Sequence, residues 1–261
     1  MMLVNISHLF VLEETKILRS LIIVMSFISV LPIPQRFIPD WNSNTLRYFC
    51  PMLAIAGIIF GALWLLIWQM LSLAGSLSPV LRGMFMTLLT LALTGGLHLD
   101  GLMDSCDAIF SRRDRQTRLA ILSDPHAGSF AVMGCVVMLL AKTLLFSEML
   151  TLDINPSLVP IYSRLGMAVL LNNLPFAKSG GLAVMLGSSR SQKHNIFFAL
   201  MMIMLLFVNP VAQVIAFIVI LLLWRSICLR IFGGITGDLL GAFVELSELF
   251  MLTCMVIGEC I

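Results

Sequence analysis

Residues 49–73 read FCPMLAIAGIIFGALWLLIWQMLSL and contain no charged side chain. The uncharged interval around them extends from Arg47 to Arg82. A helix that crosses the hydrocarbon core of a bilayer, roughly 30 Å thick, needs about 20 predominantly apolar residues. This stretch meets that requirement, and turn-forming residues from Gly75 to Pro79 follow it. We therefore predict a transmembrane helix over residues 49–73.

The composition also favours a membrane protein. Of the 261 residues, 59% are hydrophobic and 11% are charged, whereas soluble domains carry about 25% charged residues. Such a chain is not expected to fold as a water-soluble globule. Its net charge of +2 supplies no broad basic face for a duplex, so nucleic acid is not expected as a partner.

Further apolar stretches predict more spans. They cover residues 83–99, 130–150, 158–177, 239–258 and the uncharged run 195–224, which Asn209-Pro210 divides into two short spans. We therefore predict an all-α polytopic integral membrane protein with about seven transmembrane helices, in one domain over residues 1–261.

The segment over residues 17–30 is shorter, carries Arg19 and ends at Leu31-Pro32-Ile33-Pro34. It predicts a short N-terminal helix that is re-entrant or interfacial. A signal peptide is the alternative, but Glu13 and Glu14 precede the segment and no small-residue cleavage site follows it.

The distribution of positive charge predicts the orientation. Loops 32–48, 100–129, 178–194 and 225–238 hold 11 of the 16 Lys and Arg residues, whereas loops 74–82 and 151–157 hold only Arg82. Positively charged loops are retained in the cytoplasm. The charged loops are therefore expected on the cytoplasmic side, together with any chemistry that they carry.

An acidic motif follows the span predicted over residues 83–99. It reads HLDGLMDSCDA from His98 to Ala108, and on a helix Asp100, Asp104 and Asp107 lie within about 60° of one another. Three such carboxylates repel one another unless a cation neutralises them, and oxygen ligands of this kind suit Mg²⁺. The motif predicts a Mg²⁺ site at the membrane boundary. A solvated acidic face at a helix end is the alternative.

A second acidic motif lies near the C-terminus, over residues 233–245. Asp238 and Glu245 flank the small residues Gly241 and Ala242 on one helical face, which would let another helix or a ligand approach closely. Ionisable residues inside an apolar span are functional candidates. The alternatives are that Glu245 is hydrogen-bonded between helices and that Asp238 caps its helix.

Cations and a turn complete the candidate site. Lys142 and Arg164 lie inside apolar stretches, and Arg112 begins an arginine cluster after the first motif. Arg and Lys bind phosphate, so these residues predict a phosphorylated, diphosphate-like substrate. Asp124 lies in a turn-rich stretch and can add a ligand from the facing loop. A Lys142–Glu148 pair and a purely topogenic arginine cluster are the alternatives.

These motifs resemble those of a known family. The stretch GGLHLDGLMDSCD (95–107), Ser123-Asp124 with Gly128, Ser163-Arg164, and the stretch from Gly233 to Glu245 are similar to adenosylcobinamide-GDP ribazoletransferases, also called cobalamin synthases. The N-terminal Leu-Pro-Ile-Pro resembles that family's opening as well, so the likeness covers nearly the whole chain. Ala108 and Leu165 depart from it, because the family tends to have glycine at both positions.

The resemblance implies a membrane enzyme of the last steps of cobalamin biosynthesis, in the bacterial cytoplasmic (inner) membrane. A ribose hydroxyl of α-ribazole, or of its 5′-phosphate, would attack the diphosphate of adenosylcobinamide-GDP, and GMP would leave. Asp100, Asp104 and Asp107 would be the primary Mg²⁺ ligands. Asp124, Asp238 and Glu245 would be further ligands, or one of them the base. Arg164 and Lys142 would contact the diphosphate, with Arg112 as a further candidate, and homo-oligomerisation stays open.

Two other functions fit parts of the pattern. CDP-alcohol phosphotransferases also hold metals with helical aspartates, but their D-G-x-x-A-R step is absent after Asp100. A cation transporter would use intramembrane acids such as Glu245 as an ion path. The clustering of acids at one predicted boundary argues against transport.

Overall fold

The computed structural model describes residues 2–180 and 182–260, and these are folded almost entirely into helices. The longer helices are α1 (Met2–Ile28), α3 (Phe49–Leu73), α4 (Pro79–Thr94), α5 (Leu97–Phe110), α7 (Ser129–Leu152), α8 (Val159–Asn173), α10 (His194–Val208), α11 (Val211–Ile227) and α12 (Gly237–Cys260). The shorter elements are η1 (Gln35–Phe37), α2 (Ser43–Leu46), α6 (Arg115–Ile121), α9 (Leu182–Gly187) and the π-helical turn η2 (Cys228–Phe232). The described residues form no strand, so the predicted all-α fold is confirmed.

The structure does not confirm the predicted number of membrane spans. Within the described residues, four helices are long and apolar enough to cross a bilayer: α3, α7, α11 with η2, and α12. Helices α4 and α5 pass that test only as a pair, and they are bent by 93°. Helices α8 and α10 have 15 residues each, fewer than the about 20 that a span needs. The structure supports a multi-pass membrane protein, but it does not confirm about seven spans.

Two glycines cause the bend between α4 and α5. Gly95 and Gly96 both adopt left-handed backbone conformations, with φ values of +60° and +77°. Their N–H groups donate to the carbonyls of Ala92 and Leu91, which closes the end of α4. The span predicted over residues 83–99 is therefore wrong at its C-terminal end, and the first acidic motif lies on a separate helix.

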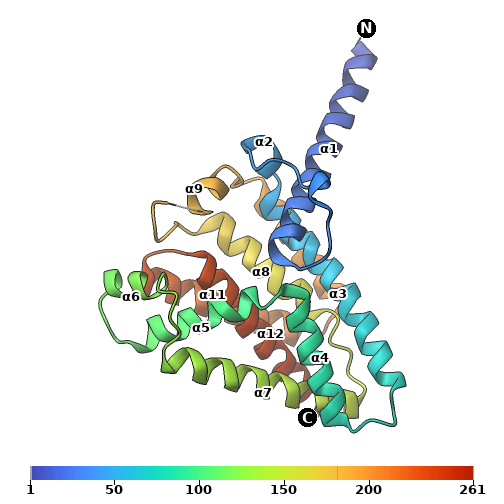
Figure 1. Ribbon diagram of the computed structural model, residues 1–261. Coiled ribbons are helices and arrows are strands. Elements are labelled where there is room, and N and C mark those ends of the chain that lie inside the picture. Colours follow the sequence, from blue (N-terminus) through green and yellow to red (C-terminus); the bar gives the residue numbers. More distant parts are fainter. Residues whose placement is uncertain (1, 181, 261) are drawn as a thin grey trace.

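The N-terminal helix is longer than the predicted segment over residues 17–30. It extends from Met2 to Ile28, and its N-terminal end projects beyond the other helices (Figure 1). Its last turns are anchored, because Ile23, Val24 and Ile28 are fully buried. The structure confirms that this segment is helical and corrects its bounds.

Prolines set two of the other helix ends. Pro210 separates α10 from α11, as predicted. Helix α8 ends at Asn173, before the predicted residue 177, because Leu174 precedes Pro175 and takes an extended conformation.

Helix α12 lies among α5, α7, α8 and α11 (Figure 1). Glycines allow close packing elsewhere: a Cβ on Gly83 would lie 2.5 Å from the Thr143 carbonyl oxygen, and one on Gly61 would lie 2.6 Å from that of Ser157. Small residues commonly form such crossings in membrane proteins. The outer face of α7 exposes apolar side chains, Val132, Val136, Leu140 and Leu144, which suits contact with lipid.

Candidate active site

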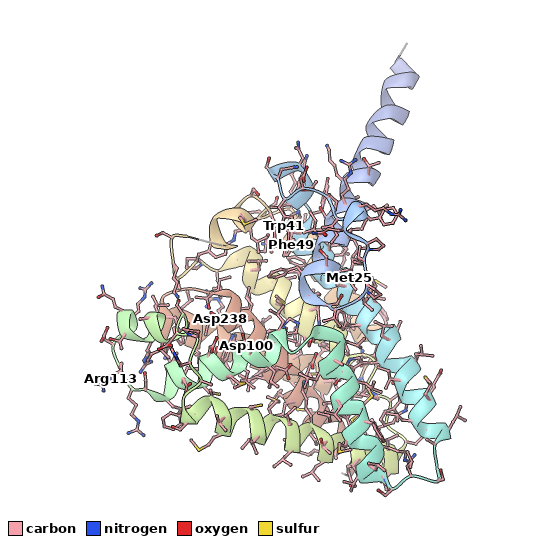
Figure 2. The ribbon with its side chains drawn as sticks, viewed as in Figure 1. Met25, Trp41, Phe49, Asp100, Arg113 and Asp238 are labelled. Carbon is pink, nitrogen blue, oxygen red and sulfur yellow. The ribbon has the colours of Figure 1, made fainter. Side chains whose placement is uncertain are left out.

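Two glycines bring the acidic motifs together. A Cβ on Gly101 of α5 would lie 2.7 Å from the carbonyl oxygen of Asp238 and 3.0 Å from its Cα. A Cβ on Gly241 of α12 would lie 3.2 Å from the Cα of His98. The α5 and α12 backbones therefore meet where each carries its aspartates, and Figure 2 shows Asp100 and Asp238 side by side. The small residues of the second motif therefore let helix α5 approach closely. The sequence left open whether a helix or a ligand would do so.

Four carboxylates concentrate negative charge at this crossing. Asp104 is half-buried, and the charges of Asp100, Asp238 and Asp107 all act on it. Asp238 accepts a hydrogen bond from Oγ1 of Thr236 at 3.3 Å. Across residues 2–180 and 182–260, neither Asp100 nor Asp104 has a hydrogen bond to another side chain. Carboxylates this close require a compensating cation to remain ionised together.

Asp107 also has a structural role that the sequence did not reveal. Its Oδ2 accepts a hydrogen bond from the Gly128 N–H at 2.6 Å, and its Oδ1 accepts one from the Ala131 N–H at 3.0 Å. These are groups at the start of α7, which otherwise lack partners. Asp107 thus caps α7 from α5 and fixes the angle at which the two helices meet.

The second glycine pair positions the start of α12. Gly233 has a φ of +71°, and the guanidinium of Arg115 packs where its side chain would be. A Cβ on Gly234 would lie 2.4 Å from the Pro175 carbonyl oxygen. The next residue, Ile235, donates to that same oxygen at 2.9 Å. Arg115 is exposed, and its guanidinium packs on Gly233 in the turn before α12.

Three hollows meet at the acidic cluster. A cavity of about 280 Å³ is lined by both Asp100 and Asp238. An adjoining cavity of about 180 Å³ shares Asp238 and contains Lys178. A wider hollow of about 560 Å³ over the Gly95–Gly96 bend shares Asp100. Lys178 was not singled out by sequence reasoning, although its charge acts on Asp238.

The cluster fits Mg²⁺ by the chemistry of its donors. Asp100, Asp104 and Asp238 offer carboxylate oxygens, which are the ligands of hard cations. In the observed side-chain conformations, however, no group of three or more His, Cys, Asp or Glu residues in the described part of the chain is arranged to hold an ion. Ion binding therefore requires these side chains to rotate.

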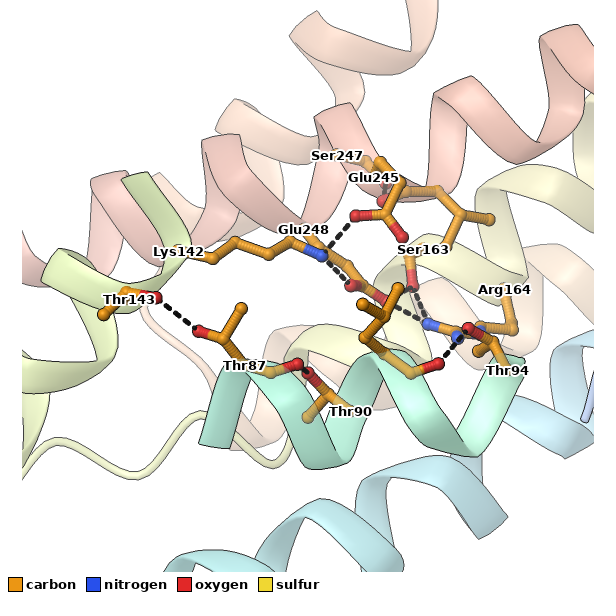
Figure 3. Close-up of polar contacts among 12 residues, drawn as sticks. Thr87, Thr90, Thr94, Lys142, Thr143, Ser163, Arg164, Glu245, Ser247 and Glu248 are labelled. Carbon is orange, nitrogen blue, oxygen red and sulfur yellow. Dashed lines mark hydrogen bonds and ion pairs between the residues drawn. The ribbon is translucent and has the colours of Figure 1, made fainter. Parts of the chain in front are cut away.

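A separate ion cluster lies inside the helices (Figure 3). Lys142 Nζ of α7 donates to Glu245 Oε2 at 2.6 Å and to Glu248 Oε2 at 2.8 Å. Arg164 of α8 forms an ion pair with Glu248 and donates to Ser163 Oγ at 2.8 Å. All four charged residues are at most 6% exposed. The space beside them is about 10 Å³, room for at most one water.

The structure separates some residues that the sequence grouped. Lys142 bonds directly to Glu245 and to Glu248, and Glu248 joins Lys142 to Arg164. None of these residues forms a hydrogen bond or ion pair with the four aspartates. Glu245 is therefore hydrogen-bonded between two helices, α12 and α7, which is the alternative that the sequence left open. Lys142 pairs with Glu245 and Glu248, not with Glu148, which is exposed. Glu248 lies one helical turn after Glu245, which was the available signal for it.

The two remaining candidates lie on the surface. Asp124 is exposed and accepts hydrogen bonds from the backbone and ring of His126 at 3.0 and 2.7 Å. These bonds hold the pKa of Asp124 below its usual range. Arg112 is exposed at the end of α5 and has a φ of +54°. Neither residue contacts the cluster around Asp104.

Comparisons with known proteins agree with the motifs. Residues 20–256 match the family described as Cobalamin-5-phosphate synthase. The adenosylcobinamide-GDP ribazoletransferase of Desulfitobacterium hafniense (strain Y51) is 33% identical over 90% of this chain and 95% of that protein. Proteins with the same name from Geobacillus kaustophilus and Escherichia coli are 34% and 30% identical, over 83% and 89% of this chain and 87% and 97% of those proteins. No solved structure matches the chain.

The family match and the relatives both cover most of the chain, and the acidic motifs that carried the resemblance meet at one helix crossing. The chain therefore belongs to the cobalamin-5-phosphate synthase family.

Proposed function

We propose that this protein is a membrane transferase that joins adenosylcobinamide-GDP to α-ribazole or α-ribazole 5′-phosphate. A ribose hydroxyl oxygen of the acceptor forms a bond to the phosphorus that bears the cobinamide. The bond from that phosphorus to the GMP oxygen breaks. The hydroxyl proton passes to a carboxylate of the site, and adenosylcobalamin, or its 5′-phosphate, and GMP are the products.

The meeting of Asp100, Asp104 and Asp238 beside the cavities is the observation that supports this proposal. Phosphoryl transfer requires positioned reactants and neutralised charge more than it requires a covalent intermediate. Mg²⁺ held by these three carboxylates would supply positive charge to the diphosphate and to the leaving GMP. Asp107 holds α5 against α7 so that its neighbours face the cavities.

The phosphate contacts are assigned to Lys178 at this crossing, with the surface residue Arg112 as a further candidate. Lys178 lines the cavity that adjoins Asp238, and Arg112 is exposed at the end of α5. Lys142 and Arg164 are enclosed with two glutamates, which supports a role in holding α7, α8 and α12 together rather than in contacting substrate.

The site is assigned to the cytoplasmic face of the bacterial inner membrane. The loops richest in Lys and Arg include residues 100–129 and 225–238, which flank the two acidic motifs. The positive-inside bias places such loops in the cytoplasm. Both substrates would then reach the site from the compartment in which nucleotides are available.

Product formation by the purified protein in lipid nanodiscs tests the proposal. We expect GMP and the cobalamin product in equal amounts from adenosylcobinamide-GDP and α-ribazole, no product in excess EDTA, and recovery on addition of Mg²⁺. Phospholipid formation from CDP-diacylglycerol, or cation flux across proteoliposomes, without GMP release would overturn the proposal in favour of the two alternatives. The family match does not favour either of them.

A further inference from the structure

Two exposed aromatic side chains stack where α5 ends and α7 begins. Phe110 is the last residue of α5 and Phe130 lies in the first turn of α7, and they are 54% and 40% exposed. Their ring centroids lie 5.4 Å apart. Asp107 holds the two helix ends together through its bonds to the Gly128 and Ala131 N–H groups. The Phe110–Phe130 pair is therefore a fixed apolar surface.

The pair is continuous with the face of α7 that suits lipid. Helix α7 is long and apolar enough to cross a bilayer. Residues three and four apart share one helical face, and the stripe that begins at Phe130 stays exposed through Met133, Val137, Leu140 and Leu144. Because Phe130 lies in the first turn of such a helix, the pair lies where hydrocarbon gives way to lipid headgroups.

Two arginines adjoin the pair at that boundary. Arg112 and Arg113 are exposed, and Figure 2 shows Arg113 extending beyond the helices. Neither arginine forms an ion pair in the described part of the chain. The neighbouring carboxylate, Asp114, instead caps α6 by accepting from the Gln116 and Thr117 N–H groups. Guanidinium groups match phosphate oxygens in geometry and charge, so both arginines are available to a phosphate.

We infer that this corner of the protein binds the headgroup of an anionic phospholipid, with Phe110 and Phe130 against the upper acyl chain and Arg113 on the phosphate. Apolar rings beside cations are what anchors helices to anionic membrane surfaces. A free phosphate ion would meet the arginines but not the rings, which favours a lipid as the source of the phosphate. A lipid held at the end of α5 ties the first acidic motif to one leaflet. This inference uses no step of the proposed reaction.

Fluorescence quenching by brominated lipids tests the inference in the full-length protein. Phe110→Trp keeps an aromatic ring and adds a fluorophore, and the unsubstituted protein gives the background from the four native tryptophans. Nanodiscs of phosphatidylcholine would carry the same small fraction of either brominated phosphatidylglycerol or brominated phosphatidylcholine. One cation near an anionic surface enriches the lipid about fivefold. The added emission should therefore be quenched several times more strongly by the phosphatidylglycerol.

A charge-removing variant separates the arginine contact from general attraction to the membrane. Arg113→Gln, made in the Phe110→Trp protein, should lose most of the preference for phosphatidylglycerol. Its thermal midpoint in detergent should not change, because Arg113 has no ion pair among the described residues. Lys193→Gln is the matched control: it removes the same charge from an exposed residue before α10 and should keep the preference.

Three results would overturn the inference. Equal quenching by the two lipids would show that the corner does not select an anionic headgroup, and no added quenching by either would place the Phe110–Phe130 pair outside the bilayer. A preference that is lost in excess inorganic phosphate at constant ionic strength would show that the arginines bind the free ion instead. None of these measurements requires turnover, so their failure is distinct from failure of the proposed function.

Discussion

Asp104 is the carboxylate on which the charges of three other aspartates act. Replacing it with Asn keeps its shape and removes its charge. Asp104→Asn should lower kcat at least about a hundredfold, because a metal-bound transition state loses about 3 kcal/mol of stabilisation. The thermal midpoint should not fall, since no hydrogen bond of Asp104 to the described residues is lost.

Asp153→Asn is the matched control for that measurement. Asp153 is exposed between α7 and α8 and has a φ of +56°, a conformation that Asn adopts readily. GMP release by this variant should equal that of the unsubstituted protein. Full activity of Asp104→Asn at ordinary Mg²⁺ would contradict the metal assignment.

Glu248 joins the two buried cations Lys142 and Arg164. In Glu248→Gln both lose a charged partner inside the protein. Removing one member of a buried ion cluster typically costs about 3 kcal/mol or more, so thermal denaturation in detergent should show a large loss of stability. Glu148→Gln, on the exposed face of α7, should change stability by less than about 0.5 kcal/mol. Equal stability of the two variants would show that the ion cluster is dispensable.

The first acidic motif was predictable because one helix carries all its members, at spacings that fix their common face. Glu245 was grouped with Asp238 by their common helical face, but the structure bonds Glu245 to Lys142. Seven residues of helix separate them by about 10.5 Å along the axis, so one face does not mean one site. The partners of Glu245 come from two other helices, and a single sequence does not record which helices adjoin.

At the scale of elements, Gly101 sets how closely α5 approaches α12. A Cβ at this position would lie 2.7 Å from a backbone oxygen of Asp238, so Gly101→Ala must push the two helices apart. Overpacking of this kind lowers the free energy of unfolding by about 1–3 kcal/mol. Because the aspartates are displaced as well, kcat should fall by more than the loss of stability alone explains.

Gly75→Ala provides the control for this element. Nothing lies within 4 Å of a Cβ at Gly75, and the residue is exposed in the turn between α3 and α4. Its stability and kcat should match those of the unsubstituted protein. If Gly101→Ala behaves in the same way, the crossing of α5 and α12 does not position the site.

Helix ends were predictable where proline marks them and not where glycines lie inside an apolar run. Asn209-Pro210 gave the break before α11 correctly. Gly95-Gly96 stands within a continuous apolar stretch, and hydropathy alone extends one helix through it. Both glycines adopt the left-handed conformation that closes the end of α4, and hydropathy does not report this local signal.

For the complete chain, hydropathy identified the membrane class, while the predicted number of spans is not confirmed. The short helix α8 is apolar because it packs on other helices with nearly every residue buried, whereas α10 exposes most of its apolar side chains, Phe207 and Met204 among them. An apolar core helix and a membrane span have the same composition, and length is what separates them. The class of the fold was therefore predictable from composition, whereas the number of spans stays a prediction.

The orientation of the molecule can be tested by cysteine labelling. Ser76 is exposed in the turn between α3 and α4, and Gln116 is exposed on α6, next to the acidic motif. If the site faces the cytoplasm, a membrane-impermeant maleimide should label Ser76→Cys in right-side-out vesicles and should label Gln116→Cys only after permeabilisation. The unsubstituted protein gives the background from the native cysteines. The reverse pattern would place the acidic cluster outside, where the nucleotide-bearing donor is not available, and would contradict the cytoplasmic site.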